Sequence, residues 1–206
     1  MTARIEPLRE RDAAAAGELL AASHDAYPAY QVLWPNPQVR RRVLCGYLTG
    51  IARDAAAWGG AVLAKDGPDA VGATLWLPPG AFPLAVSRKL RLTPSMLRMA
   101  GGGPRSALSF ALLGARLARG GGTGPSWYLR AMGVRPEARR RGIGALLLAP
   151  VLARADEEGV RCRLHLADPT AVPYYQSHGF RLTGLEVPLP WHAGSASYLA
   201  MVRAPR

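Results

Sequence analysis

The sequence predicts a mixed α/β fold, with helices on both faces of one sheet. Strand-like and helix-like patterns alternate along the chain, and turn signals rich in glycine and proline separate them. In order, the pattern gives a strand, two helices, a hairpin and a basic insertion, then strand, helix, strand, helix and two closing strands. This alternation favours a sheet layered between helices. We expect the 206 residues to form one domain, 1–206, with a substantial core.

The first element is a short strand at residues 4–8, and a helix follows it. Asp12 can cap this helix, which continues to about Ser23 with an alanine-rich interior. An aromatic loop comes next, from Tyr27 to Pro37. We expect no regular helix in this loop, because its prolines remove backbone donors and restrict the residues before them.

A long second helix and a hairpin complete the N-terminal part. Apolar residues recur at helical spacing over about residues 38–57, and Gly59-Gly60 ends this helix. Residues 61–65 and 70–77 then have the pattern of two strands. They are joined by Asp66-Gly67-Pro68-Asp69, a composition that is typical of a tight turn.

Residues 81–122 are predicted to form a basic, helix-rich insertion. Glycine triplets at 101–103 and 120–122 are expected to act as hinges. The segment contains no acid, and its positive residues are Arg88, Lys89, Arg91, Arg98, Arg105, Arg116 and Arg119. The net charge of the chain is +12, which suits an anionic partner such as nucleic acid, lipid or a cofactor. An arginine-rich source proteome explains much of the same excess, and most charge runs are solvated faces.

The C-terminal part predicts alternating strands and helices. The elements are a strand at 126–134, a helix at 142–158 that Pro150 should bend, a strand at 161–167, a short helix at 169–177, and closing strands at 180–187 and 197–203. An arginine-rich loop joins the first of these strands to the first helix. A loop that opens a helix offers unpaired N–H groups and the positive end of the helix dipole to an anion.

The glycines of this loop indicate what kind of anion it binds. Gly142 and Gly144 let the backbone approach a phosphate closely, and the amides of residues 140–145 can point at its oxygens. Leu147 occupies the third position of Gly-x-Gly-x-x-Gly, which argues against a dinucleotide fold. The loop therefore predicts a phosphate-bearing cofactor. The alternative is a glycine-capped loop with solvated arginines.

These features resemble the GNAT superfamily of N-acetyltransferases. The acyl-CoA motif of that family stands here as Arg139-Arg140-Arg141-Gly142-Ile143-Gly144, and Tyr175 lies four residues before Gly179-Phe180. The resemblance covers about residues 125–187 and is closest to the puromycin N-acetyltransferase-like group. It implies a GNAT-type mixed, mostly antiparallel sheet flanked by helices, with a helical insertion between the third and fourth strands. It also implies transfer of an acetyl group from acetyl-CoA to the primary amine of a small molecule by direct attack.

The resemblance also implies a cofactor site and a general acid. The strand that ends at Val134 is expected to splay from its neighbour, so that its main chain pairs with the pantetheine arm and the Met132 N–H points at the thioester carbonyl. The implied cofactor-binding residues are Met132, Gly133, Val134, Arg139, Arg140, Arg141, Gly142, Ile143, Gly144 and Ala145. Tyr175 is the implied general acid for the leaving thiolate, the alternative being a packed core tyrosine. Tyr174 is expected to pack.

His165 is the first candidate for the base that takes a proton from the amine. It stands where many relatives carry glutamate, and histidine titrates near neutral pH. On the predicted strand it shares one face with Arg161 and Arg163. A hydrogen-bonded structural histidine is an equal alternative. Weaker candidates for the base are Glu186, Asp25 and His24.

The acceptor pocket is expected to be aromatic. Family members build it from the first helices, the loop between them and the closing strands, and the predicted contacts here are Tyr27, Tyr30, Trp34 and Trp127. Such side chains suit a flat or partly apolar amine, and few acids are available to hold a polycation. The alternative is that these residues only close the core. The insertion at 81–122 can cap this pocket or mediate a homodimer.

Other functions have less support in the sequence. Cys162 and His165 would point to opposite faces of a strand, so no metal site is expected. The longest apolar run falls short of a membrane span and no export signal is visible, so we expect a cytoplasmic protein with reduced thiols. The remaining alternatives are a regulatory GNAT module that binds acyl-CoA without turnover, a protein N-acetyltransferase and, less expected, a nucleic-acid-binding protein.

Overall fold

The computed structural model describes residues 3–82, 84–85, 87–88, 92–94, 102–119, 124–192, 194 and 196–206. Its centre is a seven-stranded sheet in the order β1-β2-β3-β4-β5-β7-β6. The strands are β1 (Arg4–Pro7), β2 (Ala61–Asp66), β3 (Asp69–Leu77), β4 (Ser126–Val134), β5 (Arg161–Leu166), β6 (Arg181–Pro188) and β7 (Ser197–Arg203). Neighbouring strands are antiparallel except β4 and β5, which are parallel. The predicted mixed, mostly antiparallel sheet is confirmed.

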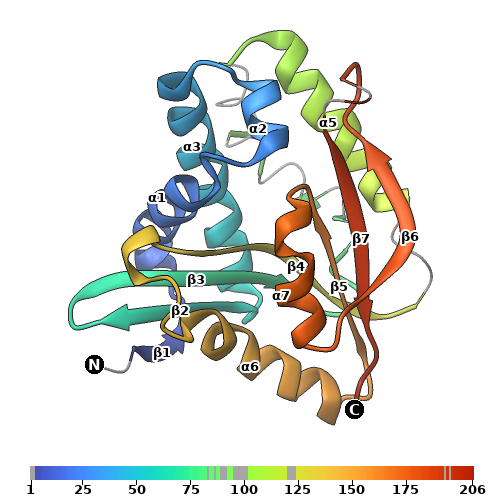
Figure 1. The fold of residues 1–206 in the computed structure, drawn as a ribbon. Helices are drawn as coiled ribbons and strands as arrows, with labels where there is room; N and C mark the ends of the chain where they lie inside the picture. The colour runs from blue at the N-terminus through green and yellow to red at the C-terminus, as the bar shows by residue number, and fades with distance from the viewer. Residues whose placement is uncertain are drawn as a thin grey trace.

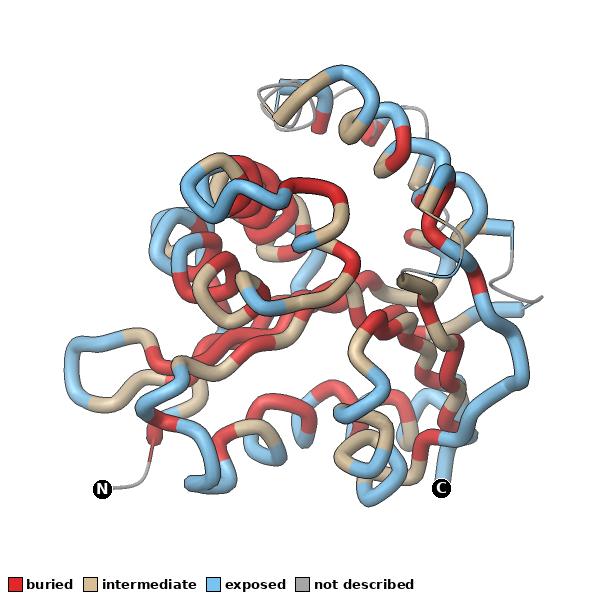
Figure 2. The backbone as a smooth tube through the Cα atoms, turned by 45° about the horizontal axis from the view of Figure 1, so that its top comes forward, coloured by how far each residue is buried: buried red, intermediate tan, exposed pale blue. Residues whose placement is uncertain are grey.

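Helices cover both faces of this sheet (Figure 1). One face carries α1 (Ala13–His24) and α3 (Pro37–Ala57), and the other carries α6 (Ile143–Glu157). The buried apolar residues accordingly form two main clusters, one against α1 and α3 and one against α6. Figure 2 shows the buried residues of these helices turned toward the strands. The short helix α7 (Val172–Ser177) packs its tyrosines against the α6 cluster.

Two glycines allow α1 to approach its neighbours closely. A Cβ atom on Gly17 would lie 2.1 Å from Thr49 Oγ1 of α3, and one on Gly133 of β4 would lie 2.0 Å from Ser23 Oγ. A side chain at either position would clash, so glycine is required there. Because α1 rests on Gly133, its C-terminal end lies beside the C-terminal end of β4.

Most predicted elements are confirmed, with two corrections in the N-terminal half. The prolines of the aromatic loop do not exclude helix, because α2 (Pro28–Leu33) begins at Pro28 and α3 begins at Pro37. Proline is tolerated in the first turn, where its missing N–H would have no intrahelical partner. Asp12 does not cap α1 through its side chain. Its carboxylate instead accepts a hydrogen bond from the Arg9 N–H at 3.2 Å.

The predicted insertion contains helix α5 (Pro104–Arg119). Ser106 Oγ donates to the Leu33 carbonyl at 2.8 Å, and Ser109 Oγ donates to the Pro190 carbonyl at 2.9 Å. These bonds attach α5 to the end of α2 and to the segment after β6. The rest of the predicted insertion is described only in part, and Lys89, Arg91, Arg98, Gly101 and the triplet 120–122 lie outside the described residues.

Candidate active site

The candidate site lies where the two parallel strands separate. β4 pairs with β5 only over Ser126–Leu129, opposite Arg161–Leu164, although β4 continues to Val134. β3 stays paired with β4 as far as Val134, and β7 stays paired with β5 as far as Leu166. The main chain of β4 beyond Leu129 therefore has a free edge toward β5, and the predicted splay is confirmed.

A cavity of about 280 Å³ opens beside this free edge. Its walls come from the end of α1, the start of α2, the end of β4, the loop after β5, and α7. The lining residues are Ser23, His24, Ala26, Tyr27, Met132, Gly133, Val134, Arg139, Asp168, Ala171, Tyr174 and Tyr175. Several residues predicted from the sequence thus meet in one groove. Tyr27, which we expected on the acceptor side, is among them.

The loop before α6 presents backbone amides at the start of that helix. Arg140 and Gly142 both have left-handed φ angles, of 64° and 75°. No side chain caps α6, whose N-cap is Gly142, so its first N–H groups remain available to an anion. Ile143 is buried and can contribute only its backbone, while Ala145 is exposed. A left-handed arginine is strained, and such strain is common at ligand-binding loops.

Two arginines of this loop are attached to the rest of the protein. Arg141 Nη2 lies 2.7 Å from Asp66 Oδ2 in the β2–β3 hairpin. Arg139 Nε donates to the Val134 carbonyl at 3.3 Å. The second bond involves the free edge of β4, so a ligand that pairs with the Val134 carbonyl competes with the Arg139 side chain.

Gly144 and the tyrosines of α7 lie next to one another along this groove. A Cβ atom on Gly144 would be 2.6 Å from the Tyr174 hydroxyl and 3.2 Å from Met132 Cε. The Tyr174 hydroxyl is buried without a hydrogen-bond partner among the described residues, and the Tyr175 hydroxyl donates to Met132 Sδ at 3.9 Å. Burial raises the pKa of both phenols. Both hydroxyls are therefore protonated at neutral pH and can donate to a ligand, which adds to the packing role expected for Tyr174.

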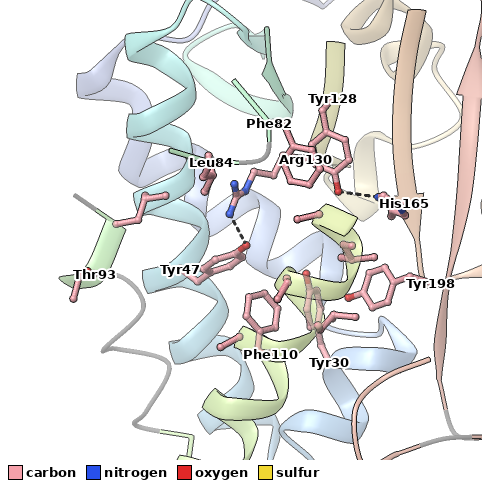
Figure 3. Close-up of a pocket in the computed structure, with 17 residues that line it drawn as sticks. Tyr30, Tyr47, Phe82, Leu84, Thr93, Phe110, Tyr128, Arg130, His165 and Tyr198 are labelled. Carbon is pink, nitrogen blue, oxygen red and sulfur yellow. Dashed lines mark hydrogen bonds between the residues drawn. The ribbon is translucent and has the colours of Figure 1, made fainter. Parts of the chain in front are cut away.

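A second cavity, of about 480 Å³, lies between α2, α3, α5 and the sheet (Figure 3). Its walls combine aromatic with small and aliphatic side chains, and Tyr30 is the residue among the predicted acceptor contacts that lines it. The aromatic and ionisable lining residues are Tyr30, Tyr47, Phe82, Phe110, Tyr128, Arg130, His165 and Tyr198. Trp34 does not line it; this buried side chain packs behind the wall, with its ring 6.0 Å from those of Tyr30 and Phe110.

A β-bulge interrupts β4 beside this second cavity. In the β3–β4 register Leu75 pairs with Ala131 and Trp76 pairs with Leu129, so Arg130 is an extra residue. Arg130 lines the cavity together with Tyr128, two residues before it on the same face of the strand. The bulge changes the facing of the residues that follow, so that Ala131 also packs on the side of α1 and α3. The sequence interpretation missed Arg130, although its spacing from Tyr128 was a signal that could have found it.

The structure corrects the expectation for Trp127. Its side chain is 1% exposed and belongs to the core cluster under α6. The indole Nε1 donates to Glu158 Oε2 at 2.8 Å, and the Arg154 guanidinium lies 5.0 Å from the ring centroid. Trp127 lines neither cavity, because successive strand residues point to opposite faces and its neighbour Tyr128 points into the second cavity.

His165 reaches the second cavity from β5. Its Nδ1 lies 3.1 Å from the Tyr128 hydroxyl, while its Nε2 is buried and has no partner among the described residues. Burial, and then the nearby charge of Arg163, lower the pKa of His165 to about 4. The imidazole is therefore neutral at pH 7. A pKa this low makes it a weak base.

The weaker candidates for the base are engaged elsewhere. Asp25 forms an ion pair with Arg40 at 2.9 Å, and the exposed Glu186 accepts a hydrogen bond from Ser197 Oγ. His24 lines the first cavity, but its Nδ1 lies 2.8 Å from the Leu20 carbonyl and burial lowers its pKa.

The described residues contain no group of three or more His, Cys, Asp or Glu that could hold a metal ion. No helix in the described ranges is long and apolar enough to cross a membrane.

Comparison with known proteins agrees with this geometry. Residues 110–182 match the family model of the acetyltransferase (GNAT) domain. The whole chain is similar to the structure of histone acetyltransferase HPA2 and related acetyltransferase from Corynebacterium glutamicum, with a TM-score of 0.72 and 22% identity over 100% of this chain and 98% of that one.

Two further structures share the fold. Polyamine N-acetyltransferase from Drosophila melanogaster gives a TM-score of 0.63 at 17% identity, covering 98% of this chain and 99% of that one. The PaiA N-acetyltransferase from Thermoplasma acidophilum, solved with coenzyme A, gives 0.60 at 13% identity, covering 99% of both chains. The protein has the GNAT fold, and residues 110–182 carry the match to the GNAT domain model. These comparisons do not point to the puromycin N-acetyltransferase-like group.

Proposed function

We propose that this protein is an acetyl-CoA-dependent N-acetyltransferase that acts on the primary amine of a small molecule. The observation that carries the proposal is the free edge of β4, which lies beside both the glycine turn at α6 and Tyr175. We infer that residues 1–206 form one cytoplasmic acetyltransferase domain. We also infer that the protein is related to the puromycin N-acetyltransferase-like group.

The groove at this edge has the chemistry that coenzyme A requires. The uncapped first turn of α6 offers amides to a pyrophosphate, with Arg140, Gly142, Ile143, Gly144 and Ala145 forming the backbone around it. Gly144 lets the Tyr174 hydroxyl and Met132 pack closely against the first turn of α6. The main chain of Met132–Val134 can pair with an extended amide arm, as a strand would. Arg139 and Arg141 add positive charge at the entrance.

The chain's own groups then account for the transfer. The acceptor nitrogen attacks the thioester carbonyl carbon, the C–S bond breaks, and one proton moves from nitrogen toward the departing sulfur. The Met132 N–H serves as the donor to the carbonyl oxygen as it gains charge, and such a donor is typically worth about 10²–10³ in rate. The Tyr175 hydroxyl donates to the sulfur as the thiolate leaves. Its raised pKa keeps the phenol protonated until that moment.

The second cavity serves as the acceptor site in this proposal. It is bounded by Tyr30, Phe110 and Tyr128, and it reaches β4 and β5 at the point where they separate. A volume of about 480 Å³ suits a small molecule. His165 lines this cavity beside Tyr128. With a pKa of about 4 it helps to position the amine more than it removes the proton, so water remains a route for that proton.

Calorimetry and a thiol-release assay test this function together. Acetyl-CoA should bind with a measurable heat, and a panel of primary amines should release free coenzyme A. Tight binding without turnover on any amine or peptide would favour a regulatory acyl-CoA module. Turnover on peptide N-termini alone would favour a protein N-acetyltransferase. The absence of coenzyme A binding would exclude all three readings.

A further inference from the structure

We propose that the acceptor carries a carboxylate or similar anion in addition to its amine, and that Arg130 and Tyr47 bind this anion in the second cavity. The inference rests on the proposed function, because it specifies the substrate class of the same site. Its evidence is the charge and lining of the cavity.

Arg130 brings a positive charge into an aromatic environment. Its side chain extends from the β4 bulge into the cavity, where Nη2 donates to the Tyr47 hydroxyl at 3.2 Å (Figure 3). Asp54 is the acid whose charge acts on Arg130. Both Asp54 oxygens, however, accept hydrogen bonds from the buried Arg88 guanidinium. The direct partner of Arg130 is thus the neutral Tyr47 hydroxyl, and the more distant Asp54 is already paired with Arg88.

Among the residues that the structure describes, no carboxylate lines the cavity around Arg130. Residues 81–122, which supply most of the outer wall, contain no acid anywhere in their sequence. A cation in such an apolar setting is costly unless it is paired. A ligand that brings an anion removes this cost, and the planar guanidinium fork matches a carboxylate.

The same cavity disfavours a polycationic acceptor. A diamine would place its second positive charge among Arg130 and the aromatic walls, with no acid to receive it. Arg163 on β5 adds to the positive field, as its effect on His165 shows. The fold is shared with a polyamine acetyltransferase, but the lining residues of this chain have the opposite charge preference. The stacked Phe82 and Tyr128 rings, 4.0 Å apart, suit an apolar or aromatic group on the acceptor.

A matched acceptor panel tests the inference directly. Thiol release from acetyl-CoA is measured with amino acids, their amides and their decarboxylated amines, and with agmatine as a dication. The best acceptors should carry a carboxylate: phenylalanine, for example, should exceed phenylalaninamide and 2-phenylethylamine by about tenfold or more in kcat/KM. Equal or better use of the amides, the decarboxylated amines or agmatine overturns the inference and leaves acetyl transfer itself intact.

Variants connect the preference to its residues. Arg130→Met should abolish the preference for the carboxylate, and Tyr47→Phe should reduce it, because the phenol that orients the guanidinium is lost. Arg105→Met removes an exposed arginine of α5 outside the cavity and should leave the preference unchanged. A carboxylate preference that survives Arg130→Met in a folded protein contradicts the inference. If Arg130→Met does not fold, the carboxylate preference of the wild type and its reduction in Tyr47→Phe test the inference instead.

Binding without turnover separates this inference from the proposed function. 3-Phenylpropionate has a carboxylate and no amine, so with coenzyme A present it should raise the melting temperature of the wild type and of Arg105→Met, but not of Arg130→Met. If 3-phenylpropionate binds through Arg130 but no amine is acetylated, the anion site is supported and the proposed transferase activity is rejected. Failure of 3-phenylpropionate to bind would reject the anion site, whether or not amines are acetylated.

Discussion

Replacing His165 with glutamine should make the protein less sensitive to mild acid. Burial and the charge of Arg163 lower the pKa of His165 from 6.5 to about 4 in the folded protein. In the unfolded chain the imidazole returns to its ordinary value. Between these two pKa values the unfolded state binds a proton that the folded state does not, so falling pH favours unfolding through this residue.

The size of the effect follows from the two pKa values. Above pH 6.5 His165 is neutral in both states and does not change the free energy of unfolding. As the pH falls from 6.5 to 4, the stability present at higher pH is progressively lost. With pKa values of 6.5 and about 4, the loss is about 2 kcal/mol between pH 8 and pH 5 and approaches about 3 kcal/mol below pH 4. The glutamine variant lacks this loss.

Urea unfolding at pH 8 and pH 5 measures the difference between the proteins. Tyr128→Phe is a suitable control, because it removes the hydroxyl 3.1 Å from His165 Nδ1 and leaves the imidazole buried. This control should keep the acid sensitivity of the wild type. His24, which is also buried with a lowered pKa, is present in every protein compared and cancels. Equal loss of stability at pH 5 in His165→Gln and the wild type would refute the reasoning.

The same variant bears on catalysis. If His165 is neutral down to about pH 4, its titration does not produce an acidic limb of kcat/KM near pH 6.5. His165→Gln should then lower the rate and leave the position of any such limb unchanged. A limb that disappears in His165→Gln would instead identify the residue as the base.

Three other substitutions test the groove and its support. Tyr175→Phe should lower kcat by about 10²-fold or more with unchanged acetyl-CoA affinity, whereas Tyr174→Phe should change kcat by much less; similar kcat losses in both would remove the special role of Tyr175. Gly144→Ala should raise the acetyl-CoA Kd, measured by calorimetry, about tenfold or more. Adding Tyr174→Phe should recover part of the lost affinity, because it removes the hydroxyl that lies 2.6 Å from the new Cβ. Gly133→Ala should destabilise the protein by roughly 1–3 kcal/mol in urea, since its Cβ would lie 2.0 Å from Ser23 Oγ; an unchanged midpoint would show that α1 moves off β4 without cost.

The sequence predicts structure well where local chemistry decides it. The turn between β2 and β3 is an example, because Gly67 adopts the left-handed φ of 63° that few other residues tolerate. The observed β4 begins and ends at the predicted residues, and its divergence from β5 was expected from the resemblance. The glycine turn at α6 was likewise predictable, because Gly142 is left-handed and begins the helix.

The sequence predicts less where a residue has two compatible environments. A proline breaks a helix when it lies in the interior but is tolerated in the first turn. Pro28 and Pro37 lie in the first turns of α2 and α3. The flanking residues decide between the two outcomes. Trp127 and Tyr128 are adjacent aromatic residues of one strand, and either could face the acceptor. The sheet register assigns Trp127 to the core under α6 and Tyr128 to the cavity.

The bulge at Arg130 is a feature that no sequence pattern indicated, and it changes which face the rest of β4 presents to α1. Before the bulge, Leu129 faces the α6 cluster; after it, Ala131 faces the α1 and α3 cluster while Met132 again faces α6. Both faces of β4 carry apolar residues, so the exchange of faces at the bulge cannot be seen in the pattern of apolar and polar residues. Without the extra residue, Arg130 could not enter the acceptor cavity while Gly133 still lies under α1. One local departure from regular strand geometry thus puts Arg130 in the second cavity and Gly133 under α1 on the same face of the sheet.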